Sequence, residues 1–158
     1  MEDMLVRLLH LPPLEPETQR MAAAGITIRR PNPFEWGPLR DWIKERFGRS
    51  WVDETSVAFS QQPVTAFVAV RDKEYLGFAA YDCVWRGGFG PTGVDESERG
   101  KGIGRALLLA CLHAARSEGY VYYQIAGVGP ADFYRKAVRA EVIADQHPNV
   151  YDIAGLTD

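Results

Sequence analysis

The segment GVDESERGKGIGRALL, residues 93–108, carries the most informative pattern in this chain. It joins a stretch with strand character to the start of a helix, and glycine occupies every second position from 100 to 104. Glycine lets the backbone approach a ligand closely and tolerates positive φ, so several amides can converge on one anion. The helix that begins here adds unpaired N–H groups and a dipole of roughly half a positive charge. Together with Arg99, Lys101 and Arg105, these amides predict a pyrophosphate-binding site; a glycine-rich turn exposed to solvent is the alternative.

The spacing of the glycines narrows the class of phosphate ligand. A Walker loop requires G-x-x-x-x-G-K-[ST], but the Gly-Lys pair here is followed by another glycine, so a nucleoside triphosphatase does not fit. The dinucleotide pattern G-x-G-x-x-G fails as well, because its third glycine would fall at Arg105 or Leu107. The pattern that fits is R-x-x-G-x-G, which is met by Arg99, Gly102 and Gly104.

Hydrophobic periodicity predicts the elements around this segment. Apolar residues recur at helical spacing from Ile103 to Ala114, which predicts a long helix. Two β-branched and aromatic runs separated by a polar turn predict a hairpin, and the Gly- and Pro-rich stretch after it predicts a bulged strand. Ser50 and Asp53 have the spacing of a capping box at the start of a helix. The predicted order is helix 17–24, strand 26–29, helices 39–47 and 50–60, strands 64–70, 75–85 and 87–94, helix 103–118, strand 120–126, helix 131–137, and strands 141–144 and 150–153.

Over its full length, segment 93–108 resembles the coenzyme A signature of the GNAT superfamily of acyl-CoA-dependent N-acyltransferases. The predicted order of elements from about Ile26 to Ile153 agrees with that family. The resemblance implies an α/β (α+β) fold, with helices flanking a mixed, mostly antiparallel sheet of six to seven strands. In that fold the fourth and fifth strands, here 87–94 and 120–126, splay apart. Residues 1–25 lie outside the resemblance; we expect them to form an N-terminal extension with a short helix, followed by a GNAT-like domain at 26–158 whose sheet starts at Ile26.

The resemblance also implies acetyl-CoA as a cosubstrate, bound along the splayed strands. The backbone of Thr92, Gly93 and Val94 would pair with the pantetheine arm like an added strand. Backbone amides would hold the pyrophosphate, and two aromatic residues would border the cofactor. The residues implied for these contacts are Arg99, Gly100, Lys101, Gly102, Ile103, Gly104 and Arg105 for the pyrophosphate, and Phe133 and Tyr134 for the border.

Tyr134 matches the family's tyrosine on the short helix after the fifth strand, and the resemblance implies that it is the general acid. Collapse of the tetrahedral intermediate expels a thiolate of pKa ~8.5, and a phenol of pKa ~10 can donate a hydrogen bond or a proton to it. The alternative role is structural, with the ring packed in the core and the hydroxyl at its rim.

The acceptor amine must lose a proton before it attacks, and a nearby carboxylate or a water relay usually takes that proton. Alternation along strand 75–85 places Asp82 on one face with three apolar side chains, a setting that would raise its pKa and suit a base. Two alternatives remain open: Asp82 lies beyond the buried part of the strand, or Glu54 in the second helix is the base.

Aromatic residues gather in the segments that would border the acceptor. Core or rim packing is one interpretation of them, and an aromatic-lined acceptor pocket is the other. The residues concerned are Trp51, Phe59, Tyr81, Trp85 and Phe89.

Composition limits the remaining function classes. A length of 158 residues, 46% of them hydrophobic, suits one folded, water-soluble domain. A formal net charge of -3 argues against a nonspecific nucleic-acid binder. Cys83 and Cys111 form no C-x-x-C pair, so we expect neither a disulfide framework nor a bound metal. The apolar stretch 5–11 is too short and too charged for a signal peptide or a membrane span, which favours a cytoplasmic protein that does not act at a membrane.

The resemblance predicts an N-acetyltransferase. By resemblance, it would transfer an acetyl (acyl) group from acetyl-CoA to a primary amine of a small molecule or peptide, by direct attack in a ternary complex. One alternative is a domain that binds acyl-CoA as a sensor without turnover. Another is a partner-binding module whose N-terminal extension docks a second chain. A homodimer is the default assembly for a protein of this size.

Overall fold

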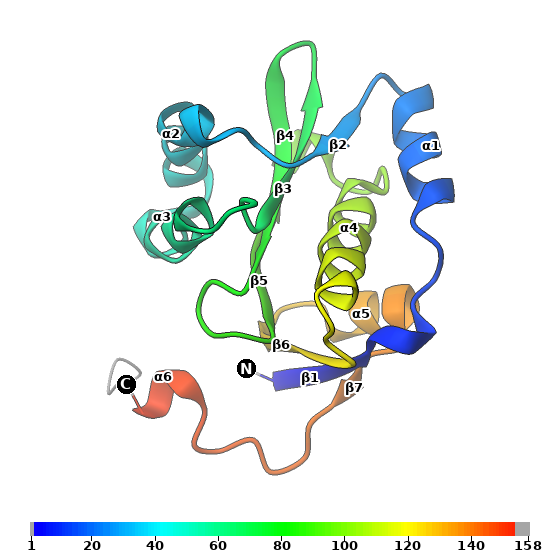
Figure 1. The fold of residues 1–158 in the computed structure, drawn as a ribbon, viewed down its shortest axis with the longest axis vertical. Helices are drawn as coiled ribbons and strands as arrows, with labels where there is room; N and C mark the ends of the chain where they lie inside the picture. The colour runs from blue at the N-terminus through cyan, green and yellow to red at the C-terminus, as the bar shows by residue number, and fades with distance from the viewer. Residues whose placement is uncertain (1, 154–158) are drawn as a thin grey trace.

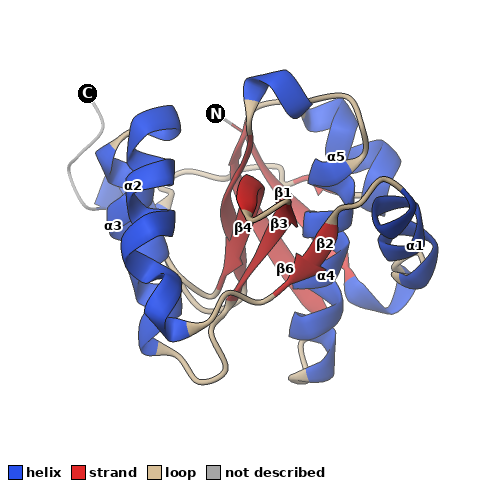
Figure 2. Cartoon of the chain, turned by 90° about the horizontal axis from the view of Figure 1, so that it is seen from above, coloured by secondary structure: helices blue, strands red, loops and turns tan. Residues whose placement is uncertain are grey.

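A computed structural model describes residues 2–153, which form a seven-stranded sheet with helices on both faces (Figure 1, Figure 2). The strand order is β2-β3-β4-β5-β6-β1-β7, and among the neighbouring strands of residues 2–153 only β5 and β6 run parallel. This confirms the predicted mixed, mostly antiparallel sheet. The strands are β1 (Glu2–Arg7), β2 (Thr27–Arg29), β3 (Ala66–Arg71), β4 (Glu74–Tyr81), β5 (Gly88–Val94), β6 (Tyr122–Val128) and β7 (Glu141–Val142).

The helices form a layer on each side of the sheet, with α2 and α3 on one side and α4, α1 and α5 on the other (Figure 1, Figure 2). They are α1 (Glu15–Ala23), α2 (Trp36–Phe47), α3 (Arg49–Ser56), α4 (Ile103–Ser117), α5 (Ala131–Val138) and α6 (Val150–Ile153), and 3-10 turns occupy Leu8–His10, Pro33–Glu35, Val57–Ser60 and Glu96–Glu98. No helix within residues 2–153 is both long enough and apolar enough to cross a bilayer.

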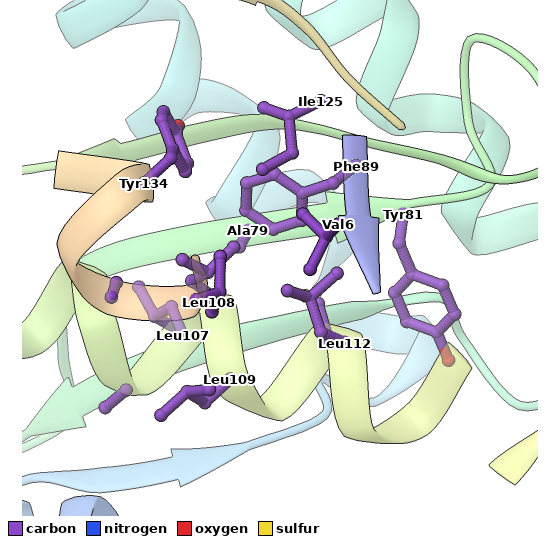
Figure 3. Packing of buried hydrophobic residues seen from close by; sticks show 14 of the residues in the cluster. Val6, Ala79, Tyr81, Phe89, Leu107, Leu108, Leu109, Leu112, Ile125 and Tyr134 are labelled. Carbon is purple, nitrogen blue, oxygen red and sulfur yellow. The ribbon is translucent and has the colours of Figure 1, made fainter. Parts of the chain in front are cut away.

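Alternation along β4 supplies both layers of the core. Phe78 packs in the cluster under α2 and α3 with Leu39 and Ile43, whereas Ala79 and Tyr81 belong to the cluster under α4. Figure 3 shows this second cluster, to which α4 contributes a row of leucines. The sheet is therefore buried on both faces along its central strands, as a three-layer fold requires.

β5 and β6 separate after two residue pairs. Gly88 pairs with Gln124 and Phe89 with Ile125. Beyond these pairs, β5 stays with β4 through Val94, while β6 pairs with β1 on its other edge. The predicted splay between strands 87–94 and 120–126 is confirmed, and in the described residues no strand covers this edge of β5 beyond Phe89.

The prediction that the sheet starts at Ile26 is wrong, because β1 fills a position between β6 and β7. Met4, Val6 and Leu8 alternate with exposed residues and are fully buried. This is the period-two pattern of a strand with one face in the core. Arg7 interrupts the apolar run but sits at an exposed position of the pleat, so its charge does not oppose a strand.

Two other local predictions are also wrong. Residues 150–153 form a helical turn and not a strand, because the Asn149 side chain accepts hydrogen bonds from the backbone N–H of Tyr151 at 2.9 Å and Asp152 at 3.1 Å. Such an arrangement caps a helix N-terminus. The expected capping box at Ser50 is absent from α3, which begins at Arg49 directly after Gly48 and has no side-chain cap.

The close seating of α4 on β4 depends on Gly77. A Cβ atom there would lie 3.1 Å from both the Gly93 carbonyl oxygen and Leu107 Cδ1. We expect Gly77→Ala to lower the free energy of unfolding by ~1–3 kcal/mol through overpacking. A Cβ atom on Gly37 in α2 would have nothing within 4 Å, and Gly37→Ala should raise that free energy by up to ~1 kcal/mol through helix propensity. Urea unfolding of both variants tests this, and equal stability of Gly77→Ala and the parent protein would contradict it.

Candidate active site

Two cavities lie along the gap between β5 and β6, and they share Tyr134. The α4 cavity, of about 460 Å³, runs along the end of β5 and the start of α4. The α3 cavity, of about 520 Å³, lies between α3, β5, β6 and α6. The residues common to both linings are Trp51, Phe89, Thr92, Pro130 and Tyr134.

The α4 cavity collects the residues that the sequence singled out for cofactor binding. All of them except Lys101 line it, namely Thr92, Gly93, Val94, Arg99, Gly100, Gly102, Ile103, Gly104, Arg105, Phe133 and Tyr134. The Lys101 ammonium instead donates to Glu98 at 2.9 Å. Residues from distant parts of the chain thus surround one space.

The loop before α4 has the backbone shape that anion binding needs. Gly100 and Gly102 have φ of +78° and +89°, values in the left-handed region that glycine tolerates best. Gly102 is the N-cap of α4, and its carbonyl accepts the helix bond from Ala106 at 3.1 Å. The N–H groups of the first helical turn, from Ile103 to Arg105, have no helical carbonyl to bond. They remain as donors at the wall of the α4 cavity.

Two buried carboxylates hold Arg105 and Lys101, two of the cations that the sequence singled out here. Glu17, on α1, accepts from Arg105 Nε at 3.0 Å and also from Arg20. Burial raises the pKa of Glu17, but the hydrogen bonds and charges of the two arginines outweigh burial and the pKa falls below its usual value. Glu98 is likewise bonded to Arg71 and to Lys101, and the pKa of Glu98 is lowered by them in that order.

The sequence analysis missed both Glu17 and Glu98. Glu98 lies inside the motif, and its place beside Lys101 at i, i+3 was a usable signal. Glu17 is 88 positions from Arg105, and no local pattern links them. The N-terminal segment thus contributes a side chain that orients a cation of the α4 cavity.

The turn from β5 into the glycine loop is fixed by Asp95. Its carboxylate accepts from Arg46 Nε at 2.6 Å and from the Ser97 N–H at 3.0 Å. Arg46 is the main cause that lowers the pKa of Asp95 to about 2, followed by Ser97. Arg99 Nε donates to the Val94 carbonyl at 3.2 Å, which ties the loop back to the strand end.

Gly93 and Gly104 both line the α4 cavity, but the packing around them leaves different room for a side chain. A Cβ on Gly93 would lie 2.5 Å from Phe47 Cζ, so the fold itself needs a glycine there. A Cβ on Gly104 would meet Val94 at 3.7 Å and Phe133 at 3.8 Å, which are ordinary van der Waals distances. The protein interior therefore has room for alanine at position 104, and glycine is the costlier of the two residues in a helix.

Tyr134, on α5, lies at the junction of the two cavities. It packs near Phe133 and Phe89, with ring centroids 5.0 Å and 6.4 Å away, and Figure 3 shows it at the edge of the core near Phe89. Burial raises the pKa of Tyr134 to about 12. Its phenol therefore stays protonated at neutral pH and is available as a hydrogen-bond donor or an acid.

Among the described residues that line the α3 cavity, one carboxyl group lies beside several aromatic side chains. Glu54 on α3 lines it together with Trp51, Trp85, Phe89 and Tyr151. Burial raises the pKa of Glu54 above its usual value, and a hydrogen bond from the Tyr151 hydroxyl, at 3.4 Å, offsets part of that rise. Of the five aromatic residues named from the sequence, Trp51, Trp85 and Phe89 lie here.

Asp82 lines neither of the two cavities that share Tyr134. The chain leaves β4 at Tyr81, and Asp82 itself has a φ of +53°, so the expected strand face does not extend to it. Its carboxylate accepts from the Gly87 N–H at 2.8 Å, from the Tyr120 hydroxyl at 3.2 Å and from the Tyr123 hydroxyl. Asp82 lines a separate cavity that does not include Tyr134. Within residues 2–153, no three His, Cys, Asp or Glu side chains are placed to hold a metal ion.

Comparison with solved structures shows where this fold recurs. A GCN5-related glucosamine N-acetyltransferase region of a fungal multi-domain GH3 beta-N-acetylglucosaminidase superposes with a TM-score of 0.74 at 17% identity, covering 90% of this chain and 19% of that one. A GCN5-related N-acetyltransferase from Sphaerobacter thermophilus gives 0.69 at 23% identity, covering 90% and 48%. A GNAT family acetyltransferase from Brucella melitensis, solved with acetyl-CoA, gives 0.51 at 20% identity, covering 76% and 88%.

The first two of these proteins are much longer, since this chain spans less than half of each. At such identities the superpositions establish the fold alone. No curated protein matches the sequence. The model of the acetyltransferase (GNAT) family does match, over residues 30–137. That range holds the splayed strands, the glycine loop and Tyr134, and the chain accordingly belongs to the acetyltransferase (GNAT) family.

Proposed function

We propose that this chain transfers the acetyl group of acetyl-CoA to a primary amine in a ternary complex. The observation that carries the proposal is the meeting of two cavities at Tyr134, one lined by the glycine loop and one by a carboxylate among aromatic side chains. Direct transfer needs the donor and the acceptor bound at once with their reacting atoms adjacent. Two cavities that share a wall satisfy that requirement.

In this proposal the α4 cavity binds acetyl-CoA. The diphosphate lies on the N–H groups of the first turn of α4, with Arg99 and Arg105 beside it. Lys101 contributes its backbone amide and not its side chain, because its ammonium is paired with Glu98. The pantetheine arm runs along the edge of β5 that β6 leaves open and hydrogen-bonds as an added strand. The thioester then reaches the residues that both cavities share.

The acetyl transfer itself forms a C–N bond and breaks a C–S bond. The lone pair of the neutral amine attacks the thioester carbonyl carbon, and the tetrahedral intermediate collapses with the electron pair of the C–S bond moving to sulfur. The nitrogen loses two protons overall. The first is removed before attack and ends in solution. The second is lost from the intermediate to solvent, and it balances the proton that the thiolate takes up. The products are an amide, coenzyme A with its free thiol, and one proton in solution.

Tyr134 stabilises the leaving thiolate mainly as a hydrogen-bond donor. The pKa of Tyr134 is raised to about 12 by burial, whereas an ordinary thiol has a pKa of ~8.5. Compared with a thiol in water, complete transfer of the phenol proton to the thiolate is therefore unfavourable. A hydrogen bond in the same geometry carries no such cost and strengthens as negative charge develops on sulfur.

Glu54 accepts the first proton from the acceptor amine, directly or through water. It is the carboxylate that lines the α3 cavity, and Tyr134 lines the same cavity. Burial raises the pKa of Glu54 and makes it a better base than an exposed carboxylate. Asp82 is engaged by one backbone amide and two phenols in another cavity, so we assign the role to Glu54.

Removal of the Tyr134 hydroxyl should separate catalysis from binding. We expect Tyr134→Phe to lower kcat by ~100-fold or more, as loss of a general acid or its equivalent usually does. The Kd of acetyl-CoA should stay within about twofold, since the ring remains. Tyr120→Phe, which removes a hydroxyl bonded to Asp82 away from the site, is the matched control. Thiol release and calorimetry measure the two effects, and an unchanged kcat in Tyr134→Phe would refute the assigned role.

A methyl group at position 104 should harm ligand binding without harming the fold. Gly104→Ala places its Cβ in the α4 cavity at ordinary contact distances from Val94 and Phe133. We expect the free energy of unfolding to be unchanged or higher by up to ~1 kcal/mol. The Kd of acetyl-CoA should rise about tenfold, because the diphosphate can no longer approach the backbone. Gly37→Ala is the control, and tight binding by Gly104→Ala would place the diphosphate elsewhere.

The acid limb of the pH–rate profile should reflect the titration of the Glu54 carboxyl group. A base works in its deprotonated form, so kcat/KM rises with pH through the pKa of Glu54. The hydrogen bond from Tyr151 lowers that pKa, and Tyr151→Phe removes it. We therefore expect the limb of Tyr151→Phe to move to higher pH, while titration of the acceptor amine is common to both proteins. A limb that moves to lower pH in this variant would exclude Glu54 as the base.

A further inference from the structure

Five aromatic side chains from five parts of the chain line the α3 cavity, together with four glycines. The aromatic residues are Trp51 on α3, Trp85 in the loop between β4 and β5, Phe89 on β5, Tyr134 on α5 and Tyr151 on α6. Trp85 lies directly over Gly88, where a Cβ atom would be 2.6 Å from its indole nitrogen. Glycine at position 88 therefore lets this indole lie against the strand. Such walls favour an apolar or aromatic ligand body and also attract a cation placed over a ring.

In the described lining of the α3 cavity, Glu54 carries the one carboxyl group, and there is no lysine, arginine or histidine. The pKa values of Tyr134 and Tyr151 are both raised, the first to about 12, so both phenols are neutral. The adjoining cavity, of about 340 Å³, shares Trp85 and Tyr151 and also has no lysine or arginine in its described lining, whereas two aspartates line it.

From these walls and this charge, we propose that the acceptor is a small amine with an apolar or aromatic body and without a carboxylate or phosphate group. This inference rests on the proposed function, since it names the acceptor class for the same reaction. The ammonium form is drawn to the Glu54 carboxylate, and the body lies among Trp51, Trp85 and Tyr151. The α3 cavity, at about 520 Å³, has the size of an ordinary small-molecule site.

An acidic acceptor would meet two costs in this cavity. Its anion would leave water for a cavity whose described lining offers no cationic side chain, and burial of an unpaired charge is strongly disfavoured. It would also lie in the same cavity as the Glu54 carboxylate, and like charges at an interface discriminate against the wrong partner. Amino acids and amino-sugar phosphates are therefore excluded as preferred acceptors.

A matched panel of acceptors tests the class directly. Acetyl-CoA-dependent thiol release is measured with phenethylamine against L-phenylalanine, and with tyramine against L-tyrosine, so that each pair differs only by one carboxylate. We expect kcat/KM for each amine to exceed that of its amino acid by ~100-fold or more. Binding of the same four compounds to the protein saturated with coenzyme A is followed by calorimetry, which requires no turnover.

A variant pair tests the source of the discrimination. Glu54→Gln keeps the shape of the side chain and removes its charge, so the preference for amine over amino acid in the calorimetric assay should fall by about tenfold or more. Asp53→Asn is the matched control, because Asp53 is an exposed carboxylate on the same helix, paired with Arg49 at 3.5 Å and outside the α3 cavity. It should leave the preference unchanged.

The possible outcomes distinguish a failure of this acceptor class from a failure of the proposed function. Equal or better use of the amino acids, or turnover confined to peptide amines, would overturn the acceptor class while leaving acetyl transfer intact. A protein that binds coenzyme A but neither amine at millimolar concentration would overturn it as well. Failure to bind acetyl-CoA at all would instead remove the proposed function, together with everything inferred from it.

Discussion

The early separation of β5 from β6 is the constraint on which the site depends. A parallel pair that ends after Phe89 and Ile125 leaves backbone donors and acceptors of β5 without a strand partner. Buried backbone groups must be satisfied, so this edge needs either water or a ligand that hydrogen-bonds like a strand. The same separation opens the space in which the α4 and α3 cavities meet at Tyr134.

The gap persists because each strand is held on its outer edge. β5 is paired with β4 up to Val94, and β6 is paired with β1 along most of its length. Asp3 adds to this, since its carboxylate accepts from the Gly127 N–H at 2.9 Å near the end of β6. The N-terminal strand is thus a support of the site as much as an edge of the sheet, and α1 adds Glu17, which orients Arg105.

Local sequence predicted the parts of the site whose chemistry is local. The glycine loop, the cations and Tyr134 lie within short motifs, and the α4 cavity gathers them almost completely. Apart from Glu98, which lies inside the motif, the missed features depend on contacts across the chain, such as Tyr151 with Glu54, 97 positions apart. Asp82 misled the prediction because period-two alternation was extended past the end of β4, where a positive φ turns the chain away. Alternation specifies a face only while the strand continues.

The linings of the two cavities differ in their ionisable side chains, and this difference separates the proposed donor site from the proposed acceptor site. In the α4 cavity Arg99 and Arg105 outnumber Glu98, whereas Glu54 carries the one carboxyl group in the described lining of the α3 cavity, which has no lysine or arginine. An anionic donor and a cationic acceptor are each attracted to their own side. Acetylation converts the ammonium into a neutral amide, so the product loses its attraction to Glu54 while the aromatic contacts remain. In the proposed reaction the acceptor is therefore held by a charge that the reaction itself removes, which favours release of the product over its retention.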